Sequence, residues 1–268
     1  MSKPKVAFFD FTSCEGCQLA ILNLETELLE LLDIIEIVEF REAMSEKSDT
    51  YDIAVIEGSF SRDKDLKRLQ QIRKTASVVI ALGACAHIGG INSLRNNQTR
   101  EDVQRIVYPE NPTLYETNKK ALPISGAITV DAFIPGCPVD VKEFVKVVKN
   151  LVLGKAPGLP TYPVCVECKM NENTCVYEYG KTCLGPIVRA GCNAICTSNG
   201  GVCIGCRGLI PNPNINSQKD IMEKYGLNMN LIMDSMNLFM TEENKADLQQ
   251  QKAGQEQAPC SPMHPEEV

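Results

Sequence analysis

Residues 5–17, KVAFFDFTSCEGC, join a mostly apolar run to a closely spaced pair of cysteines. The run at 6–11 is typical of a buried β-strand, and Cys14 opens an amphipathic stretch that we expect to be helical to about residue 32. A strand followed by a turn and a helix is the repeating unit of α/β folds. This stretch therefore predicts the fold class and locates the first chemically distinctive residues.

The same unit recurs through the first 155 residues. Further strands are expected at 34–40, 53–56, 78–82 and 128–134, with helices at 62–74 and 139–153 and Gly154 ending the last one. Alternating strands and helices predict a parallel sheet covered on both faces. The dinucleotide-binding pattern Gly-x-Gly-x-x-Gly is absent from the sequence, so nothing here indicates a nucleotide cofactor.

A change of composition at 155–163, KAPGLPTYP, predicts a boundary between two domains. The following segment, 164–213, holds eight cysteines and little apolar material, so we expect it to need a bound metal group for stability. Residues 217–240 are expected to be helical, and the polar residues after them to be a disordered tail. The predicted parts are 1–155, 156–240 and 241–268.

The bulk composition excludes several classes of partner. The net charge is −7 and no long basic run exists, so a nucleic-acid partner is not expected. No apolar stretch reaches about 18 residues, the length that predicts a membrane-spanning helix. No signal peptide is recognisable, so we expect a cytoplasmic protein, where disulfides are disfavoured. The 13 cysteines therefore indicate metal or redox chemistry.

Four of these cysteines follow predicted strand ends: Cys14, Cys17, Cys85 and Cys137. Loops at the carboxyl ends of parallel strands converge in one crevice, so these thiols can point at one place. Four thiolates at one place can hold a [4Fe–4S] cluster. Glycines beside them, such as Gly83, would let the backbone approach such a bulky group.

The other eight form two compact sets, Cys165-x2-Cys168-x6-Cys175-x7-Cys183 and Cys192-x3-Cys196-x6-Cys203-x2-Cys206. Two sequential quartets are the natural division, and interleaved ligation, as in two-cluster ferredoxins, is the competing one. Structural zinc is the alternative metal, because four-cysteine zinc sites use the same Cys-x-x-Cys pairs. Zinc suits the first quartet less well, since its cysteines are far apart in sequence.

A set of motifs resembles the small subunit of nickel–iron hydrogenases over residues 5 to about 214. These are TSCEGC at 12–17, IEG at 56–58, GACA at 83–86, PGCP at 135–138, and the block from CLGP at 183–186 to CRG at 206–208. The resemblance implies a flavodoxin-like doubly wound sheet, followed by a small irregular iron–sulfur domain with few regular elements.

The resemblance also implies three [4Fe–4S] clusters with assigned ligands. The proximal ligands would be Cys14, Cys17, Cys85 and Cys137. The medial ligands would be Cys192, Cys196, Cys203 and Cys206. The distal ligands would be Cys165, Cys168, Cys175 and Cys183.

Periplasmic members have histidine at the place of Cys165 and often proline at that of Cys196. The all-cysteine pattern therefore resembles cytoplasmic members: the sulfhydrogenase delta subunit and the methyl-viologen-reducing or NAD-linked hydrogenases, some of them electron-bifurcating.

In this family the nickel–iron site lies in a partner large subunit, so no catalytic residue is expected in this chain. The chain would relay electrons from hydrogen oxidation to a further subunit, flavin- or NAD-linked or iron–sulfur. A related subunit of respiratory complex I is the alternative, but its ligands include adjacent cysteines. Here two residues separate Cys14 from Cys17, and the eight-cysteine segment is additional.

Three polar residues near the first quartet have two interpretations each. Glu57 would either support the site or a proton path, or accept backbone N–H bonds from a turn; we favour the second. Glu15 would either help proton movement or pair with charge at a helix N-terminus. His87 is expected to donate a hydrogen bond near the cluster or the partner rather than to ligate metal.

Overall fold

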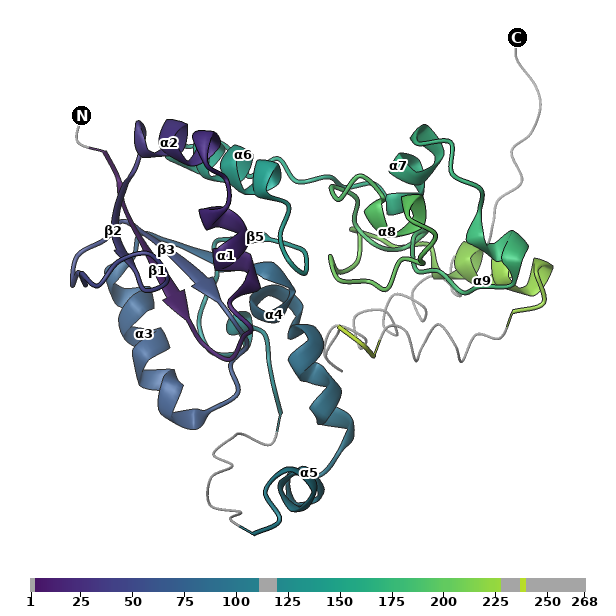
Figure 1. The fold of residues 1–268 in the computed structure, drawn as a ribbon, viewed down its shortest axis with the longest axis horizontal. Coiled ribbons are helices and arrows are strands. Elements are labelled where there is room, and N and C mark those ends of the chain that lie inside the picture. Colours follow the sequence, from purple (N-terminus) through teal and green to yellow (C-terminus); the bar gives the residue numbers. More distant parts are fainter. Residues whose placement is uncertain (1–2, 111–119, 228–236, 240–268) are drawn as a thin grey trace, which may run out of the picture.

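The computed structural model describes residues 3–110, 120–227 and 237–239. A parallel sheet with helices on its two faces forms the larger part, and a smaller part built around short helices packs beside it (Figure 1). The predicted tail at 241–268 lies outside the described residues, as do residues 228–236 and 240 of the helix predicted for 217–240. Within the described ranges, no helix has the length and apolar character needed to cross a membrane.

The sheet has five parallel strands in the order β2-β1-β3-β4-β5. Their bounds are β1 Lys5–Asp10, β2 Glu36–Phe40, β3 Ile53–Glu57, β4 Val78–Leu82 and β5 Ala132–Ile134. This is the strand order of flavodoxin-like folds, as expected. The register pairs Asp10 with Glu57, Glu57 with Leu82, and Leu82 with Ile134. Four strands therefore end level with one another at a single edge.

Alternate side chains of each strand enter two separate apolar cores. Phe8 points to the face covered by α1 (Gly16–Leu22), α2 (Thr26–Leu32) and α6 (Val141–Val152), where it stacks on Phe40 and meets Phe144. Phe9 points to the opposite face, which is covered by α3 (Leu66–Thr75). Burial on both faces explains why the strands read as continuous apolar runs.

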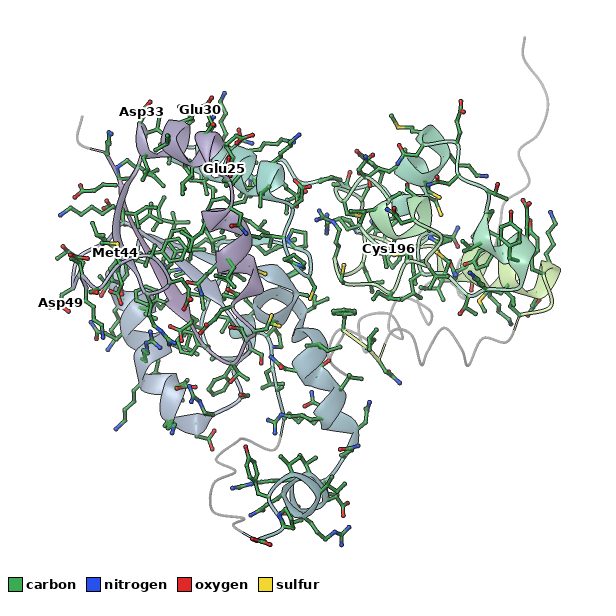
Figure 2. All side chains as sticks on the ribbon, viewed as in Figure 1. Glu25, Glu30, Asp33, Met44, Asp49 and Cys196 are labelled. Carbon is green, nitrogen blue, oxygen red and sulfur yellow. The ribbon has the colours of Figure 1, made fainter. Side chains whose placement is uncertain are left out.

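The helix expected from Cys14 to about residue 32 is two helices, which is a correction to the sequence prediction. Glu25, labelled in Figure 2, has φ 47° at the turn between α1 and α2. Leu24 in this turn is buried in the same core as Ile21 and Leu31. The bend lets all three apolar side chains reach the sheet, which a straight helix of this pattern would not allow.

The other predicted elements are close to those observed. The helix predicted at 62–74 begins with a 3-10 turn, η1 (Asp63–Asp65), before α3. The strand predicted at 128–134 is observed as the shorter β5, Ala132–Ile134. Helix α6 begins after Asp140, whose side chain caps the backbone N–H of Glu143 at 2.8 Å, and Gly154 follows its end with φ 68°. Between β4 and β5 lie α4 (Gly83–Ile88), η2 (Gly90–Asn97), α5 (Arg100–Val107) and η4 (Ile124–Gly126).

The smaller part contains α7 (Val164–Met170), η5 (Val176–Tyr179), α8 (Ile195–Ser198) and α9 (Ile215–Lys224). Its apolar side chains form a buried cluster that includes Val164, Leu184, Val188 and Met222 together with Cys183 and Cys203, and that extends to Ala84 and Ile88 of α4. Little core was expected here from the sequence, and that expectation was too low. Two thiols count as apolar packing groups when they are buried, which the composition alone did not show.

Candidate metal centres

The first cysteine quartet lies at the level edge of the sheet. Cys14 and Cys17 follow β1, and Cys17 lies in the first turn of α1. Cys85 lies in α4, directly after β4, and Cys137 follows β5. The loops touch, because the backbone N–H of Ala84 donates to the carbonyl of Gly136 at 2.7 Å. Strands that end in register thus bring these cysteines to one edge of the sheet.

The thiols of this quartet influence one another electrostatically. Burial and, after it, the neighbouring thiols of Cys137 and Cys14 raise the pKa of Cys85 to about 12. The pKa of Cys17 is also raised, first by burial and then by Glu57 and the thiols of Cys137 and Cys85. Thiols in such a place ionise together only when positive charge compensates them, and bound iron supplies that charge.

Glu57 holds the loop that carries Cys17. Its carboxylate, 2% exposed, accepts the backbone N–H of Cys17 and that of Gln18, each at 3.1 Å. This is the favoured interpretation, a carboxylate accepting backbone N–H bonds from a turn. These contacts also make Glu57 a support of the candidate ligand Cys17; a role in a proton path stays a prediction.

The two other polar residues make different contacts. Glu15 is the N-cap residue of α1 but caps no N–H with its side chain; its carboxylate lies 3.6 Å from Arg41. Burial and the nearby Glu42 raise the pKa of Glu15, while Arg41 lowers it. The ring of His87 stacks on Phe133 with centroids 3.8 Å apart, and burial lowers the pKa of His87 to about 3. His87 therefore packs as a neutral ring.

Two glycines make room for the sulfurs. A Cβ at Gly83 would lie 2.5 Å from the sulfur of Cys17, and a Cβ at Gly90 would lie 2.7 Å from that of Cys85. Both residues have positive φ, 79° and 63°, a conformation that favours glycine. Gly90 was missed by the sequence analysis, because it lies five residues after the cysteine that it contacts.

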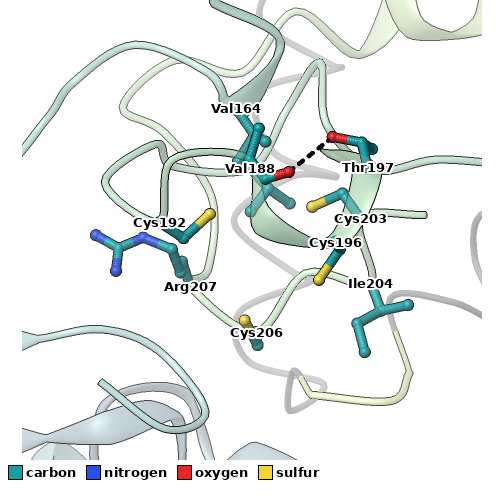
Figure 3. A pocket seen from close by; sticks show the side chains of 10 residues that line it. Val164, Val188, Cys192, Cys196, Thr197, Cys203, Ile204, Cys206 and Arg207 are labelled. Carbon is teal, nitrogen blue, oxygen red and sulfur yellow. Dashed lines mark hydrogen bonds between the residues drawn. The ribbon is translucent and has the colours of Figure 1, made fainter. Parts of the chain in front are cut away.

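The quartet Cys192, Cys196, Cys203 and Cys206 lines one pocket in the smaller part of the molecule. Figure 3 shows the four sulfurs pointing toward a common space, which has an empty volume of about 320 Å³ including its open mouth. Burial raises the pKa of Cys206 to about 11, with Cys192 among the further causes. The walls are otherwise mostly apolar and include Val164 and Val188.

The quartet Cys165, Cys168, Cys175 and Cys183 gathers around α7 and the chain before Gly185. Burial raises the pKa of Cys165 to about 12, and the other three thiols of this quartet are the next causes. A Cβ at Gly185 would lie 3.2 Å from the sulfur of Cys165 and 3.4 Å from that of Cys183. Neighbouring thiols here belong to the same sequential set, which supports that division over interleaved ligation.

Nitrogen donors reach two of the sulfurs in this quartet. The backbone N–H groups of Gly185 and Cys203 point at the sulfur of Cys183, at 3.4 and 3.3 Å. The side-chain amide of Asn173 donates to the sulfur of Cys168 at 3.7 Å. Such bonds are a means by which proteins tune the potentials of iron–sulfur groups.

Two residues with structural roles at these quartets were missed by the sequence analysis. The carboxylate of Glu167, between two cysteines of α7, accepts the backbone N–H of Gly191 at 2.7 Å and of Ala194 at 3.1 Å. It orders the loop of the next quartet as Glu57 orders that of Cys17. The second is Arg207, a buried cation beside Cys206. Both could have been found from the sequence, because each is an ionisable residue directly next to a cysteine of a quartet.

The donor sets fit iron–sulfur groups. Four thiols line one pocket in the quartet of Cys192, and in the other two quartets the thiols lie close enough to raise one another's pKa. A [4Fe–4S] group spreads its thiolate ligands over four iron atoms. A single zinc ion instead draws four sulfurs to about 2.3 Å from one centre. In the described ranges, no three or more His, Cys, Asp or Glu side chains converge in the manner of a single-ion site.

Comparison with known proteins places the chain in a family. Residues 14–151 match the family described as NADH ubiquinone oxidoreductase, 20 Kd subunit. The chain is 38% identical over 222 residues to the sulfhydrogenase 2 subunit delta of Pyrococcus furiosus, covering 82% of this chain and 92% of that protein. It is 35% identical over 237 residues to a subunit of the vhu F420-non-reducing hydrogenase of Methanocaldococcus jannaschii, covering 76% of this chain and 81% of the relative.

A solved structure shares the fold. A chain of an NAD+-reducing [NiFe]-hydrogenase in the H2-reduced state superposes with a TM-score of 0.54 at 26% identity, covering 59% of this chain and 96% of that one. The resemblance found from the motifs is thereby confirmed. The chain belongs to the NADH ubiquinone oxidoreductase 20 Kd subunit family and, within it, to the small subunits of hydrogenases.

Proposed function

We propose that this hydrogenase subunit relays electrons through three [4Fe–4S] clusters between a nickel–iron site in a partner large subunit and a further redox subunit. The observation that carries the proposal is the gathering of twelve cysteines in three groups of four. The clusters, when bound, would take up and release single electrons. The chain itself would hold, space and shield them.

The proposed ligands follow the quartets. Cys14, Cys17, Cys85 and Cys137 would hold the proximal cluster at the sheet edge. Cys192, Cys196, Cys203 and Cys206 would hold the medial one, and Cys165, Cys168, Cys175 and Cys183 the distal one. A thiol at Cys196 supplies the fourth ligand of the medial group and so favours four irons over three.

Contacts between the quartets support the order proximal, medial, distal in space. The medial pocket lies next to the proximal loop, because Arg207, which lines the pocket, donates to the carbonyl of Pro135 at 2.9 Å. The distal quartet touches the medial one through the N–H of Cys203 and the sulfur of Cys183, 3.3 Å apart. These contacts support a linear relay from the proximal to the medial to the distal group.

The surface near the proximal quartet suits a large partner. Cys14 and Cys137 are exposed, and Leu19 and Ile91 nearby are 47% and 43% exposed. Apolar side chains around a ligand set are typical of a surface that another subunit covers. The distal quartet would face the further redox subunit, flavin- or NAD-linked or iron–sulfur. The domain division near residue 155 and the cytoplasmic location stay predictions.

Metal and subunit analysis of the native complex tests the proposal. Anaerobic purification should give about twelve iron atoms and twelve sulfides per chain, as three four-iron clusters require, together with a nickel-containing partner. About three zinc ions per chain would instead support a structural zinc protein. An iron-loaded chain that copurifies with no nickel protein would make it a stand-alone electron carrier.

A further inference from the structure

Arg207 is a buried side chain that bonds to both parts of the molecule. It follows Cys206 directly and is 1% exposed. Its Nε donates to the carbonyl of Ala190 at 2.9 Å, and its Nη1 to the carbonyl of Pro135 at 2.9 Å. Its Nη2 contacts both carboxylate oxygens of Glu143, on α6, at 2.8 and 2.7 Å. One side chain thus joins the loop after β5, helix α6 and the chain before the medial quartet.

Both carbonyls that Arg207 binds lie close to proposed ligands. Pro135 precedes the proximal ligand Cys137 by two residues, and Ala190 precedes the medial ligand Cys192 by two. Arg207 itself directly follows the medial ligand Cys206. One guanidinium therefore fixes the loop of a proximal ligand against the loops of two medial ligands.

Only arginine can make this set of contacts. Its planar group offers five N–H donors in a fixed fork, whereas lysine offers a single ammonium on a flexible stem. The fit is tight, because a Cβ at Gly191 would lie 2.3 Å from Nη2 of Arg207 and 2.6 Å from Oε1 of Glu143. A buried ion pair adds little net stability over apolar packing, so its value here is geometric.

We propose that Arg207 is a positioning residue that holds the loop of Cys137 against the loops of Cys192 and Cys206, and thereby sets the spacing across which electrons pass between the proximal and medial groups. This inference rests on the proposed function. With both groups bound, one electron would leave the reduced proximal group and reduce the oxidised medial group, and no covalent bond would form or break. Arg207 would only hold the loops that carry the ligands.

The test compares wild-type complex with two variants, R207K and the double variant R207M/E143M. The double variant replaces the pair with apolar groups and leaves no unpaired carboxylate. Arg73 provides a matched control, R73M, because it too binds carbonyls, those of Ala76 at 2.7 Å and Ser77 at 3.0 Å, and pairs with Asp131. None of these partners borders a cysteine quartet.

Three quantities are measured on each complex: iron and sulfide content, the magnetic splitting between the reduced proximal and medial groups, and the rate of electron transfer between them. We expect both Arg207 variants to keep their iron while the splitting is lost or reduced and the transfer slows. R207K keeps the charge and should lie between wild type and the double variant. R73M should match wild type in splitting and rate.

Wild-type splitting and rate in both iron-loaded Arg207 variants would overturn the inference. An absent splitting between the proximal and medial groups of the wild-type complex would also overturn it. So would loss of iron from both Arg207 variants while R73M keeps its iron, because Arg207 would then be needed to retain the groups and not to set the spacing between them. A wild-type complex without iron would instead overturn the proposed function. The two failures are therefore distinguishable.

Discussion

Oε1 of Glu57 lies 3.1 Å from the backbone nitrogen of Cys17, forty residues away in sequence, and so joins the end of β3 to a proposed proximal ligand. Its other oxygen accepts the N–H of Gln18 at the same distance. Both bonds are charge-assisted and buried, the setting in which such bonds are strong. The loop after β1 is therefore held by a neighbouring strand as well as by its own helix.

Replacing Glu57 should loosen this loop. E57Q keeps one acceptor but loses the charge and adds an unpaired donor, so we expect the free energy of unfolding to fall by about 1–3 kcal/mol. E57A removes both acceptors and should cost more. Chemical denaturation of the metal-free chain measures the change without interference from bound iron.

The control for this experiment is E46Q, because Glu46 is exposed and distant from the cysteines in sequence. It should change stability by less than about 0.5 kcal/mol. Equal effects of E57Q and E46Q would show that the two N–H bonds contribute nothing to the stability of the loop.

Gly83 should be intolerant of a side chain because of Cys17. G83A places a methyl group 2.5 Å from the Cys17 sulfur in a left-handed backbone, so the sulfur must move. We expect lower iron content at the proximal site and a lower melting temperature. Gly154 is the matched control, since it has φ 68° and a Cβ added there would meet no atom within 4 Å.

The two glycine variants share the backbone cost of a left-handed alanine, about 1–2 kcal/mol. Any further loss in G83A therefore measures the contact with sulfur. If G83A and G154A lose the same stability and G83A keeps all of its iron, the sulfur of Cys17 has no fixed place in the site.

The sequence predicted the parallel sheet and the gathering of the first quartet for the same reason. Apolar runs fix the strands, and parallel strands bring the residues after them to one edge, so Cys85 and Cys137 were placed without any knowledge of packing. Arg207 could not be assigned in this way, because its partner Glu143 is 64 residues away and the pairing depends on how the two parts pack. The bend at Glu25 was missed because helical periodicity is nearly continuous across it.

The division of the last eight cysteines can be tested with two single variants. In sequential quartets Cys175 and Cys183 hold the same group, so C175S and C183S should weaken the same paramagnetic signal. In ferredoxin-like interleaving the fourth cysteine of a run ligates the other cluster, and the two variants would then affect different signals. Redox titration followed by electron paramagnetic resonance distinguishes these outcomes.

Iron content gives the same test in a second form. The double variant C175S/C183S should lose about four iron atoms per chain, those of one cluster. A loss of about eight would mean that two clusters are damaged and would contradict sequential ligation. C260S is a useful control, because Cys260 is assigned to no quartet and should leave the iron content unchanged.

Removal of iron should unfold the two parts of the chain unequally. The described residues of the sheet part, 3–110 and 120–152, bury two apolar cores against opposite faces of the sheet. The smaller part relies on one cluster, which includes its own cysteines and extends to Ala84 and Ile88 of α4. Ligation free energy contributes directly to folding where the core is small. Anaerobic chelation should therefore expose 164–213 to protease while the sheet survives.

Mass spectrometry of the fragments measures this difference, with cuts expected first in the segment between α6 and α7 and around the last eight cysteines. Burial favours neutral thiols at Cys165 and Cys206, so in the iron-free state these side chains can still pack, and the smaller part should keep some residual order instead of becoming a random coil. Restoring iron and sulfide should restore protection in this region. If the sheet is digested as fast as the cysteine-rich part, the clusters stabilise the whole chain as one unit and the predicted boundary near residue 155 is wrong.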